Sequence, residues 1–195
     1  LIRIWHGVED EIKKHDVNYV SFVGIKDNTP RNQAHILAQN KEIDVFIVIF
    51  SVLGNEASRE NMIEFLKSYQ PVPIVHIGIE IPQAHNILID GTAGLKANIS
   101  HLIEEHGHRR LAFIRGIEGH EEAEQRYQVY LDTLEKYNIP FDPDLVTPGE
   151  FIFSSGQKAV ATLLDERGVE FDAIVAANDN MAIGALRELQ RRGVK

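Results

Sequence analysis

The sequence predicts an α/β protein of two doubly wound lobes, each built around a parallel sheet. Apolar, β-rich runs alternate with helical periods along all 195 residues. The connections between them are too short to contain independent hairpins. About four strands are expected before Gly91 and about three after it. This count fits a first lobe over 1–90 and a second over 91–195 better than one continuous sheet.

The elements of the first lobe follow from the spacing of its apolar residues. Ile2, Trp5, Val8 and Ile12 recur at the helical interval. Residues 43–50 are nearly all apolar, which is typical of a strand buried on both faces of a sheet. The predicted order is a helix at 2–15, a strand at 17–23, a helix at 31–41, a strand at 43–50, a helix at 56–69, and strands at 72–78 and 86–90.

The second lobe continues the alternation and marks its helix ends with turn residues. Gly107 is a natural helix terminator, and Asn138 ends a long helical pattern. Ser154 and Gln157 resemble a capping box at the start of a helix. The predicted order is a helix at 91–106, a strand at 110–116, a helix at 120–137, a weak strand at 145–146, a helix from Ser154, a strand at 171–178, and a last helix that ends before Gly193.

Composition excludes several classes of protein. Apolar residues make up 44% of the chain and charged residues 25%, which is ordinary for a globular domain and argues against disorder. No apolar run reaches the roughly 18 residues of a transmembrane helix, so we expect no membrane contact. Cys is absent, which removes disulfides, thiolate zinc sites and cysteine nucleophiles. This absence suits a reducing compartment, and we expect a cytoplasmic protein.

Charge and motifs argue against nucleic-acid binding and catalysis by this chain itself. The formal net charge is −9, whereas phosphate binding needs clustered Lys and Arg. The basic pair Arg191–Arg192 is expected to be a solvated helix end. Neither a G-x-S-x-G nucleophile elbow nor a phosphate-binding G-x-x-x-x-G-K-[ST] loop occurs. We therefore predict no enzyme activity, no catalytic residue and no cofactor.

The histidines invite a metal hypothesis, which their spacing weakens. His101, His106 and His108 form the densest group, with Glu104 and Glu105 between them. A zinc-binding helix places two histidines one turn apart. His101 and His106 are separated by about 140° around a helix, so they are not expected to converge. We predict a polar helix end and no metal site.

In an open α/β sheet, ligands bind beyond the carboxyl ends of the strands. Side chains of Asp, Asn and Arg at such an edge can donate and accept several hydrogen bonds, and an aromatic ring can cover an apolar face of the ligand. Taken singly, each residue there is more often a turn or cap residue. The residues predicted at strand ends are Lys26, Asp27, Asn28, Ser51, Ile79, Glu80, Asp90, Glu118, His120, Asn178, Asp179 and Asn180.

Several blocks of the second half match a known family. They are Asp90–Gly91 at a helix start, HLIEEHGHRRLAFIRG at 101–116, the stretch 123–130 around Arg126, GEFIFSSG at 149–156, and FDAIVAANDNMAIGALRELQRRG at 171–193. In these blocks the chain resembles the ligand-binding core of the lactose-repressor/galactose-repressor (LacI/GalR) family, which has the fold of type I periplasmic sugar-binding proteins. The first half matches mainly in element order and in GVEDEIKKHDVNYVSF at 7–22.

The resemblance implies a ligand site at four positions. Arg126 matches the family arginine that reaches the hydroxyls or carboxylate of the ligand, a role that suits a guanidinium. Phe151 matches an aromatic that stacks on the ligand, and Asn178 matches the Asn of the A-N-D motif. Asp90 stands at the crossover between the lobes. Two structural alternatives stay open: Arg126 could pair with Glu122, and Phe151 could belong to the core.

Two further positions qualify this match. Asp179, which follows Asn178, is expected to cap the last helix rather than to touch a ligand. At Gly78 some relatives carry an acidic ligand residue, whereas this chain has no side chain there.

The resemblance also implies a function. It points to the sensing domain of a LacI-type transcriptional regulator, with a small sugar or nucleoside bound between the lobes and transmitted by lobe closure. It implies a homodimer that contacts DNA only through a headpiece outside this chain. The run EGHEEAEQR at 118–126 also resembles members fused to a histidine kinase or diguanylate cyclase, and a sugar-binding protein of a transport system is a further alternative. Because the family's first and last strands are missing, we expect a fragment of a longer protein.

Overall fold

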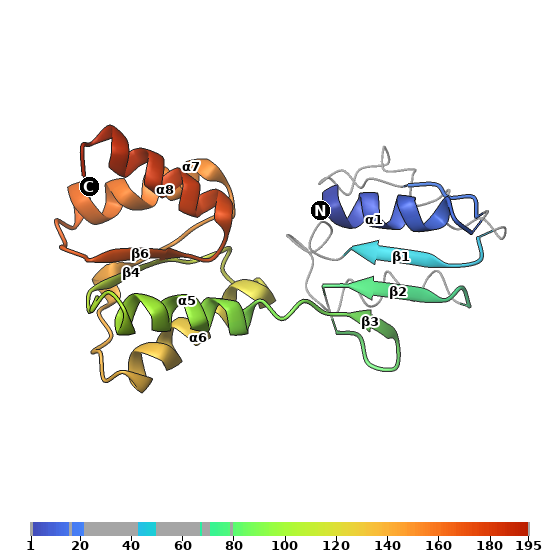
Figure 1. The fold of residues 1–195 in the computed structure, drawn as a ribbon, viewed down its shortest axis with the longest axis horizontal. Helices are drawn as coiled ribbons and strands as arrows, with labels where there is room; N and C mark the ends of the chain where they lie inside the picture. The colour runs from blue at the N-terminus through green and yellow to red at the C-terminus, as the bar shows by residue number, and fades with distance from the viewer. Residues whose placement is uncertain are drawn as a thin grey trace. The chain divides into compact units, whose positions relative to one another are not determined.

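The structure is a computed structural model that describes residues 2–15, 17–21, 43–49, 67, 71–78 and 80–194. The chain divides into two compact units, Leu1–Ile87 and Leu88–Lys195 (Figure 1). Each unit holds its own parallel sheet. The prediction of an α/β protein with two parallel sheets is therefore confirmed.

The first unit contains a three-stranded parallel sheet in the order β1-β2-β3. Ile49 lies opposite Ile77, and Ile77 lies opposite Ile87, so the strands end level with one another. These strands form in the apolar runs that predict them. The described elements are α1 (Ile2–Ile12), β1 (Phe46–Ile49), β2 (Ile74–Ile77) and β3 (His85–Ile87).

Two expectations for the first unit are wrong. Residues 17–21 of the predicted strand at 17–23 belong to no helix or strand, and Val20 is 75% exposed. A strand needs a hydrogen-bonded neighbour, and none of the described strands pairs with this segment. The run at 43–50 is not buried on both faces either, because the side chain of Ile47 is 46% exposed. The predicted helices at 31–41 and 56–69 lie outside the described residues, apart from Lys67, which is helical.

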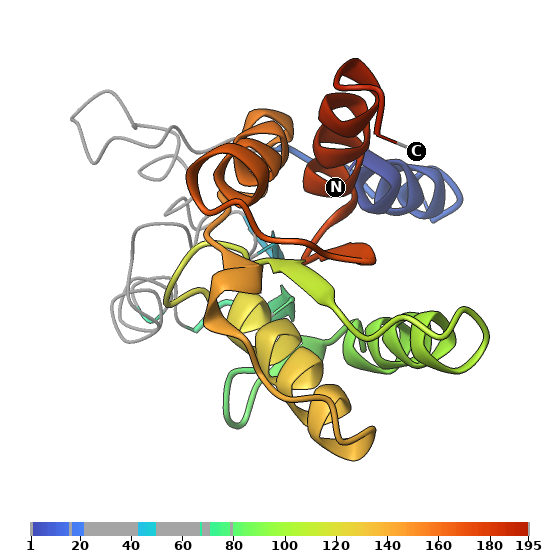
Figure 2. The same ribbon diagram turned by 90° about the vertical axis from the view of Figure 1, so that its left-hand side faces the viewer.

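The second unit is a doubly wound α/β layer structure. Its parallel strands lie in the order β5-β4-β6, with α5 and α6 on one face and α7 and α8 on the other (Figures 1 and 2). A 3₁₀ turn at Pro143–Leu145 precedes β5, and a π-helical turn at Thr162–Glu166 extends α7. The elements are α5 (Thr92–Glu104), β4 (Leu111–Ile114), α6 (Glu121–Lys136), β5 (Val146–Thr147), α7 (Phe153–Ala161), β6 (Ala173–Ala176) and α8 (Asp179–Arg191).

The central strand β4 forms the middle of the core. All four of its residues are buried. The ring of Phe113 stacks on that of Tyr130 with centroids 4.7 Å apart, and the Tyr130 hydroxyl donates to the carbonyl of Leu111 over 2.8 Å. Burial raises the pKa of Tyr130, so the phenol remains a neutral donor. One tyrosine of α6 thereby satisfies a backbone acceptor of the buried strand.

Helix ends follow the predicted turn residues in three cases, and one predicted helix start differs. Gly107 has a left-handed φ of 70° beyond α5, and the His108 N–H donates to the Leu102 carbonyl over 3.1 Å. Asn138 and Gly193 adopt left-handed φ values of 53° and 71° just beyond α6 and α8. The residue after each donates its N–H to a carbonyl of the last helical turn, as in a Schellman motif. The predicted capping box is wrong, because α7 begins at Phe153 and Ser154 lies inside it. The hydroxyl of Ser155 instead accepts from Glu150 N–H and donates to the Ile152 carbonyl.

Two glycines let α7 and α8 approach closely. A Cβ built at Gly184 would lie 2.0 Å from the carbonyl oxygen of Phe153, and one at Gly156 would lie 2.1 Å from that of Met181. Both obstacles are backbone atoms of the facing helix, so neither can turn aside. The close packing of the two helices therefore requires glycine at both positions.

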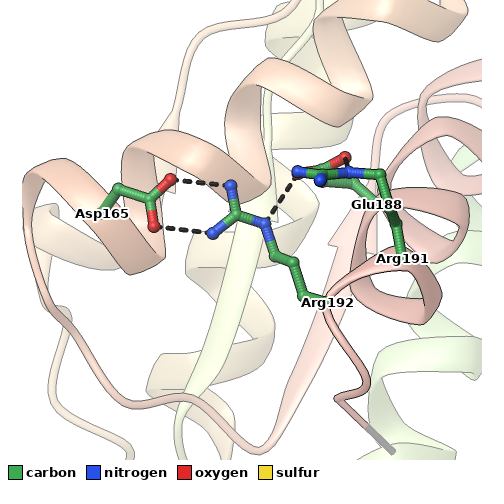
Figure 3. Close-up of polar contacts among 4 residues, drawn as sticks. All are labelled: Asp165, Glu188, Arg191 and Arg192. Atoms are coloured by element: carbon green, nitrogen blue, oxygen red, sulfur yellow. Dashed lines mark hydrogen bonds and ion pairs between the residues drawn. The ribbon is translucent and has the colours of Figure 1, made fainter.

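An ionic network joins α8 to the π-helical turn. The Arg192 guanidinium donates to both carboxylate oxygens of Asp165, over 2.6 and 2.7 Å, and to Glu188 over 2.7 Å (Figure 3). Arg191 donates twice to the same Glu188. Hydrogen bonds from Arg191 and Arg192 lower the pKa of Glu188 to about 2, although its side chain is only 8% exposed. Arg192 is thus an internal anchor rather than the solvated helix end that the sequence suggests.

Among the described residues, no helix is long and apolar enough to cross a membrane.

We expect Gly184→Ala to destabilise the second unit by about 1–3 kcal/mol, because the new methyl group overlaps a backbone carbonyl. Gly94→Ala is the matched control, since Gly94 lies inside α5 and a Cβ there meets nothing within 4 Å. The control should be neutral or slightly stabilising. Urea unfolding followed by circular dichroism measures both variants. Equal unfolding midpoints for the two would contradict the close approach of α7 and α8.

The Glu188 network predicts a loss of stability in acid. The carboxylate has a lower pKa folded than its ordinary value of 4.5, so its contribution is complete above pH 4.5 and is lost as the pH falls towards 2. Glu188→Gln should remove this part of the pH dependence of the urea midpoint. Glu166→Gln, at an exposed position of the π-helical turn, should leave it intact. Parallel acid profiles for wild type and Glu188→Gln would show that the network is not formed in solution.

Candidate functional site

The chain leaves neighbouring strands of the second unit towards opposite faces of the sheet. After β4 it enters α6 beside α5, and after β6 it enters α8 beside α7 (Figure 2). The carboxyl ends of two such strands form a topological switch point, which is where open α/β sheets bind ligands. Three of the predicted site residues, Arg126, Asn178 and Phe151, come to this edge, and a sequence of direct contacts links them.

Arg126 reaches across from α6 to the end of β6. Its Nη1 donates to the carbonyl of Ala177 over 3.1 Å, and its Nη2 donates to the Glu122 carboxylate over 2.9 Å. The expected alternative of a pair with Glu122 is therefore present. A Cβ at Gly91 would lie 3.6 Å from Nη2, so the guanidinium also sits against the start of α5. The side chain keeps 24% of its surface exposed.

Asn178 uses its amide in two directions. Its Oδ1 accepts the N–H of Met181 over 3.0 Å and caps α8, while its Nδ2 donates to the carbonyl of Phe151 over 2.9 Å. The expectation that Asp179 caps this helix is wrong, because Asp179 is its first helical residue. Asn fits the position better than Asp, since an amide can accept from one backbone group and donate to another, whereas a carboxylate only accepts.

Phe151 has an unusual backbone for an aromatic residue. Its φ of 61° lies in the left-handed region, where bulky residues are uncommon. The Nδ2 bond from Asn178 fixes its carbonyl. The ring lies over Gly116, where an added Cβ would come within 2.3 Å of Cζ, and it meets the His120 ring edge-on at 5.3 Å. Phe151 is half-buried and packs against the core, as its structural alternative predicts, and its stacking on a ligand stays a prediction.

Asp90 acts as a helix cap. Its Oδ1 accepts the N–H of Thr92 over 3.0 Å, the Thr92 hydroxyl over 2.6 Å and the N–H of Ala93 over 3.2 Å. These bonds, that of the Thr92 hydroxyl first, lower the pKa of the carboxyl and keep it ionised. Asp90 therefore fixes the beginning of α5. Its neighbour Gly91, rather than Asp90 itself, is the residue that lies against the Arg126 guanidinium.

His120, predicted only as one of the residues that follow a strand, is in direct contact with Phe151 at this edge. It is the residue before α6, its ring touches Phe151, and its Nδ1 is buried with no partner among the described groups. A buried ring nitrogen without a partner is uncommon and marks a place for an added donor or acceptor. The signal in the sequence was only its position after a strand.

Other strand-end residues fall away from the cluster or cannot be placed in it. Glu118 is exposed in the turn between β4 and α6, and the Asn180 amide approaches the Phe151 carbonyl only at 3.5 Å. In the first unit Gly78 has a left-handed φ of 86°, and its N–H donates to Ile87 over 3.0 Å. Glu80 is exposed. The predicted residues outside the described part of the chain are Lys26, Asp27, Asn28, Ser51 and Ile79.

The arrangement has the chemistry of a recognition site. It offers a guanidinium, an amide, an imidazole and an aromatic ring along one strand edge. Among the described residues, no group of three or more His, Asp or Glu side chains is placed to hold a metal ion. Planar donors beside a ring suit a polar ligand that has hydroxyls on its rim and an apolar face.

Comparisons with known proteins agree with this fold. Residues 99–195 match the family described as periplasmic binding protein-like domain. The chain is 33% identical over 125 residues to the HTH-type transcriptional regulator AscG of Escherichia coli K12, an alignment that covers 64% of this chain and 37% of AscG. The chain spans less than half the length of the curated relatives it matches.

Solved structures extend the similarity over both units. The crystal structure of the transcription regulator CcpA of Lactococcus lactis has a TM-score of 0.78 at 25% identity, covering 98% of this chain and 68% of CcpA. The complex of the transcriptional regulator CelR with cellobiose has a TM-score of 0.70 at 26% identity, covering 86% of this chain and 50% of CelR.

The parallel sheets and the switch-point edge, taken with these matches, define a periplasmic-binding-protein-like domain. The chain belongs to the LacI/GalR family and corresponds to part of its ligand-binding core.

We expect Asn178→Ala to destabilise the second unit by roughly 1–3 kcal/mol, because it removes a helix cap and leaves the Phe151 carbonyl unpaired. Asn178→Ser is the matched variant. It keeps an oxygen for the Met181 N–H but is too short to donate to Phe151, so its loss should be smaller. Thermal unfolding compares the three proteins. Wild-type stability in Asn178→Ala would contradict the double role of the amide.

Proposed function

We propose that the chain is the small-molecule sensing domain of a LacI-type transcriptional regulator, with a sugar-like ligand held between lobes 1–90 and 91–195. The observation that carries the proposal is the Arg126 guanidinium at the ends of β4 and β6, linked through Ala177 and Asn178 to the Phe151 ring. The relatives support it, because their names describe transcriptional regulators, and the CelR structure holds cellobiose.

The side chains at the edge suit a sugar or nucleoside. Arg126 spends two N–H groups on Ala177 and Glu122, and a guanidinium has five, so donors remain for ligand hydroxyls. The second N–H of the Asn178 amide can add a further bond. The Phe151 ring offers an apolar surface for the flat side of a sugar ring or a base. Glu122 orients the guanidinium, and its carboxylate can accept a hydrogen bond from a ligand hydroxyl.

Lobe closure is the proposed means of transmission. A ligand favours one arrangement of two lobes only by binding it more tightly than the other. A ligand held by Arg126, Asn178 and Phe151 on one lobe gains further contacts when the second lobe closes over it. The closed state would then be read by a DNA-binding headpiece outside this chain. We propose a homodimer in the cytoplasm, as for a bacterial regulator, with no catalytic activity.

The names of the relatives favour DNA binding as the output. The matches are HTH-type transcriptional regulators, which supports a repressor or activator over a histidine kinase, a diguanylate cyclase or a transport protein.

A thermal-shift screen of the full-length protein tests the proposal, with a panel of mono- and disaccharides, sugar phosphates and nucleosides. A ligand at a hundred times its dissociation constant adds about 2.7 kcal/mol of stability. We expect one class to raise the unfolding temperature. Arg126→Ala should weaken binding by about 10–100-fold, because hydrogen bonds from a charged group contribute about 1.5–3 kcal/mol.

Arg187→Ala is the matched control, since Arg187 is exposed on α8. It should leave the shift unchanged. A shift that survives in Arg126→Ala would refute the site while leaving the sensor function standing. A complete lack of response to the panel would refute the sugar or nucleoside class.

A further inference from the structure

Two histidines meet at the end of α5, on the turn that leads to β4. His101 lies in the last turn of the helix, and His106 follows the helix end at Glu104. Their Nε2 atoms are 3.3 Å apart, and the two rings are nearly perpendicular. The sequence-based expectation that they diverge is wrong, because it extends the helical rotation past the point where the helix stops. The turn brings His106 back over His101.

The separation of these nitrogens matches the spacing of two ligands on one metal ion. Imidazole nitrogens lie 2.0–2.1 Å from a tetrahedral Zn²⁺, which places two of them about 3.3 Å apart. Both histidines are exposed, so water can complete the coordination of an ion between them. In the absence of an ion, the same nitrogens share one hydrogen bond.

The surroundings favour a cation. The negative end of the α5 dipole lies at this turn, and Glu104 and Glu105 stand between the two histidines in the sequence. Two basic side chains of the same unit are held in other contacts. Arg109 donates to the carbonyls of Ile103 and His108, and Lys136 donates to the Tyr137 hydroxyl, which itself bonds Glu104.

A third histidine, His108, lies next to His106. The ring of His108 stacks on that of His106 at 5.7 Å and 19°. A stacked ring presents its face rather than a nitrogen to its neighbour, so His108 supports the orientation of His106 and supplies no ligand. This agrees with the absence of any three-residue metal cluster among the described residues.

We propose that His101 and His106 form a two-imidazole binding site for Zn²⁺ or a divalent ion of similar chemistry, such as Ni²⁺ or Cu²⁺. The site lies at the opposite end of α5 from Asp90 and Gly91, so it is separate from the candidate ligand edge. It does not depend on the proposed sensing function.

Calorimetric titration of ZnCl₂ into the untagged full chain at neutral pH tests the site. We expect one ion per chain to bind with an affinity that His101→Ala and His106→Ala each reduce by about tenfold or more, since even partners of metal ligands contribute roughly 10–100-fold. Binding should weaken in acid, because a coordinating imidazole must be neutral. Unaltered affinity in both variants, or no binding by the wild type, overturns the proposal.

Two further variants make the result specific. His85→Ala removes an exposed histidine from the first unit and should keep the affinity of the wild type. His108→Ala should also keep most of it, and a complete loss of binding there would overturn the assignment to two ligands. Because His101 and His106 are exposed, the metal-free variants should unfold at the wild-type temperature, which excludes misfolding as the cause.

Discussion

The Asn178 amide is the interaction on which the candidate site depends. It accepts a backbone N–H at the start of α8 and donates to the carbonyl of Phe151, so one side chain joins the end of β6 to the turn before α7. That bond holds an aromatic residue in a left-handed conformation that it would otherwise avoid. The ring is thereby fixed over Gly116 and beside His120 before any ligand arrives. Preorganisation of this kind lowers the ordering cost of binding.

Arg126 is held in place by contacts within the domain itself. Its two structural bonds, to Ala177 and Glu122, orient the guanidinium along the strand edge. A half-buried arginine held by only one partner would have to order its long side chain on binding. Here the cost is met on folding. The structural alternatives for Arg126 and Phe151 are therefore both present, and their roles as ligand contacts stay predictions.

Much of the second unit could be predicted from the sequence, because its strands are short apolar runs between strongly periodic helices. The segment at 17–21 shows the limit, since β-rich residues form a strand only if a neighbour offers backbone partners. The sequence also failed to predict that Asn178 caps α8 and that His106 approaches His101. Each depends on the residue at which a helix begins or stops. Successive helical residues are about 100° apart, so one residue more or less in the helix redirects the chain beyond its end. The contacts of Phe151 with Gly116 and His120 join distant segments, which periodicity cannot pair.

The glycines between α7 and α8 make the close packing of this helix pair depend on positions that carry no side chain. Gly156 and Gly184 face backbone carbonyls, so no side chain can be added at either without moving a whole helix. His120 and Glu122, by contrast, meet side chains rather than backbone: His120 contacts the Phe151 ring, and Glu122 accepts a hydrogen bond from Arg126. Under the proposed function, substitutions at these two positions would change the ligand contacts while the helix pair stays constant. The close packing of α7 on α8 is thus set by positions without side chains, which are separate from the candidate ligand residues.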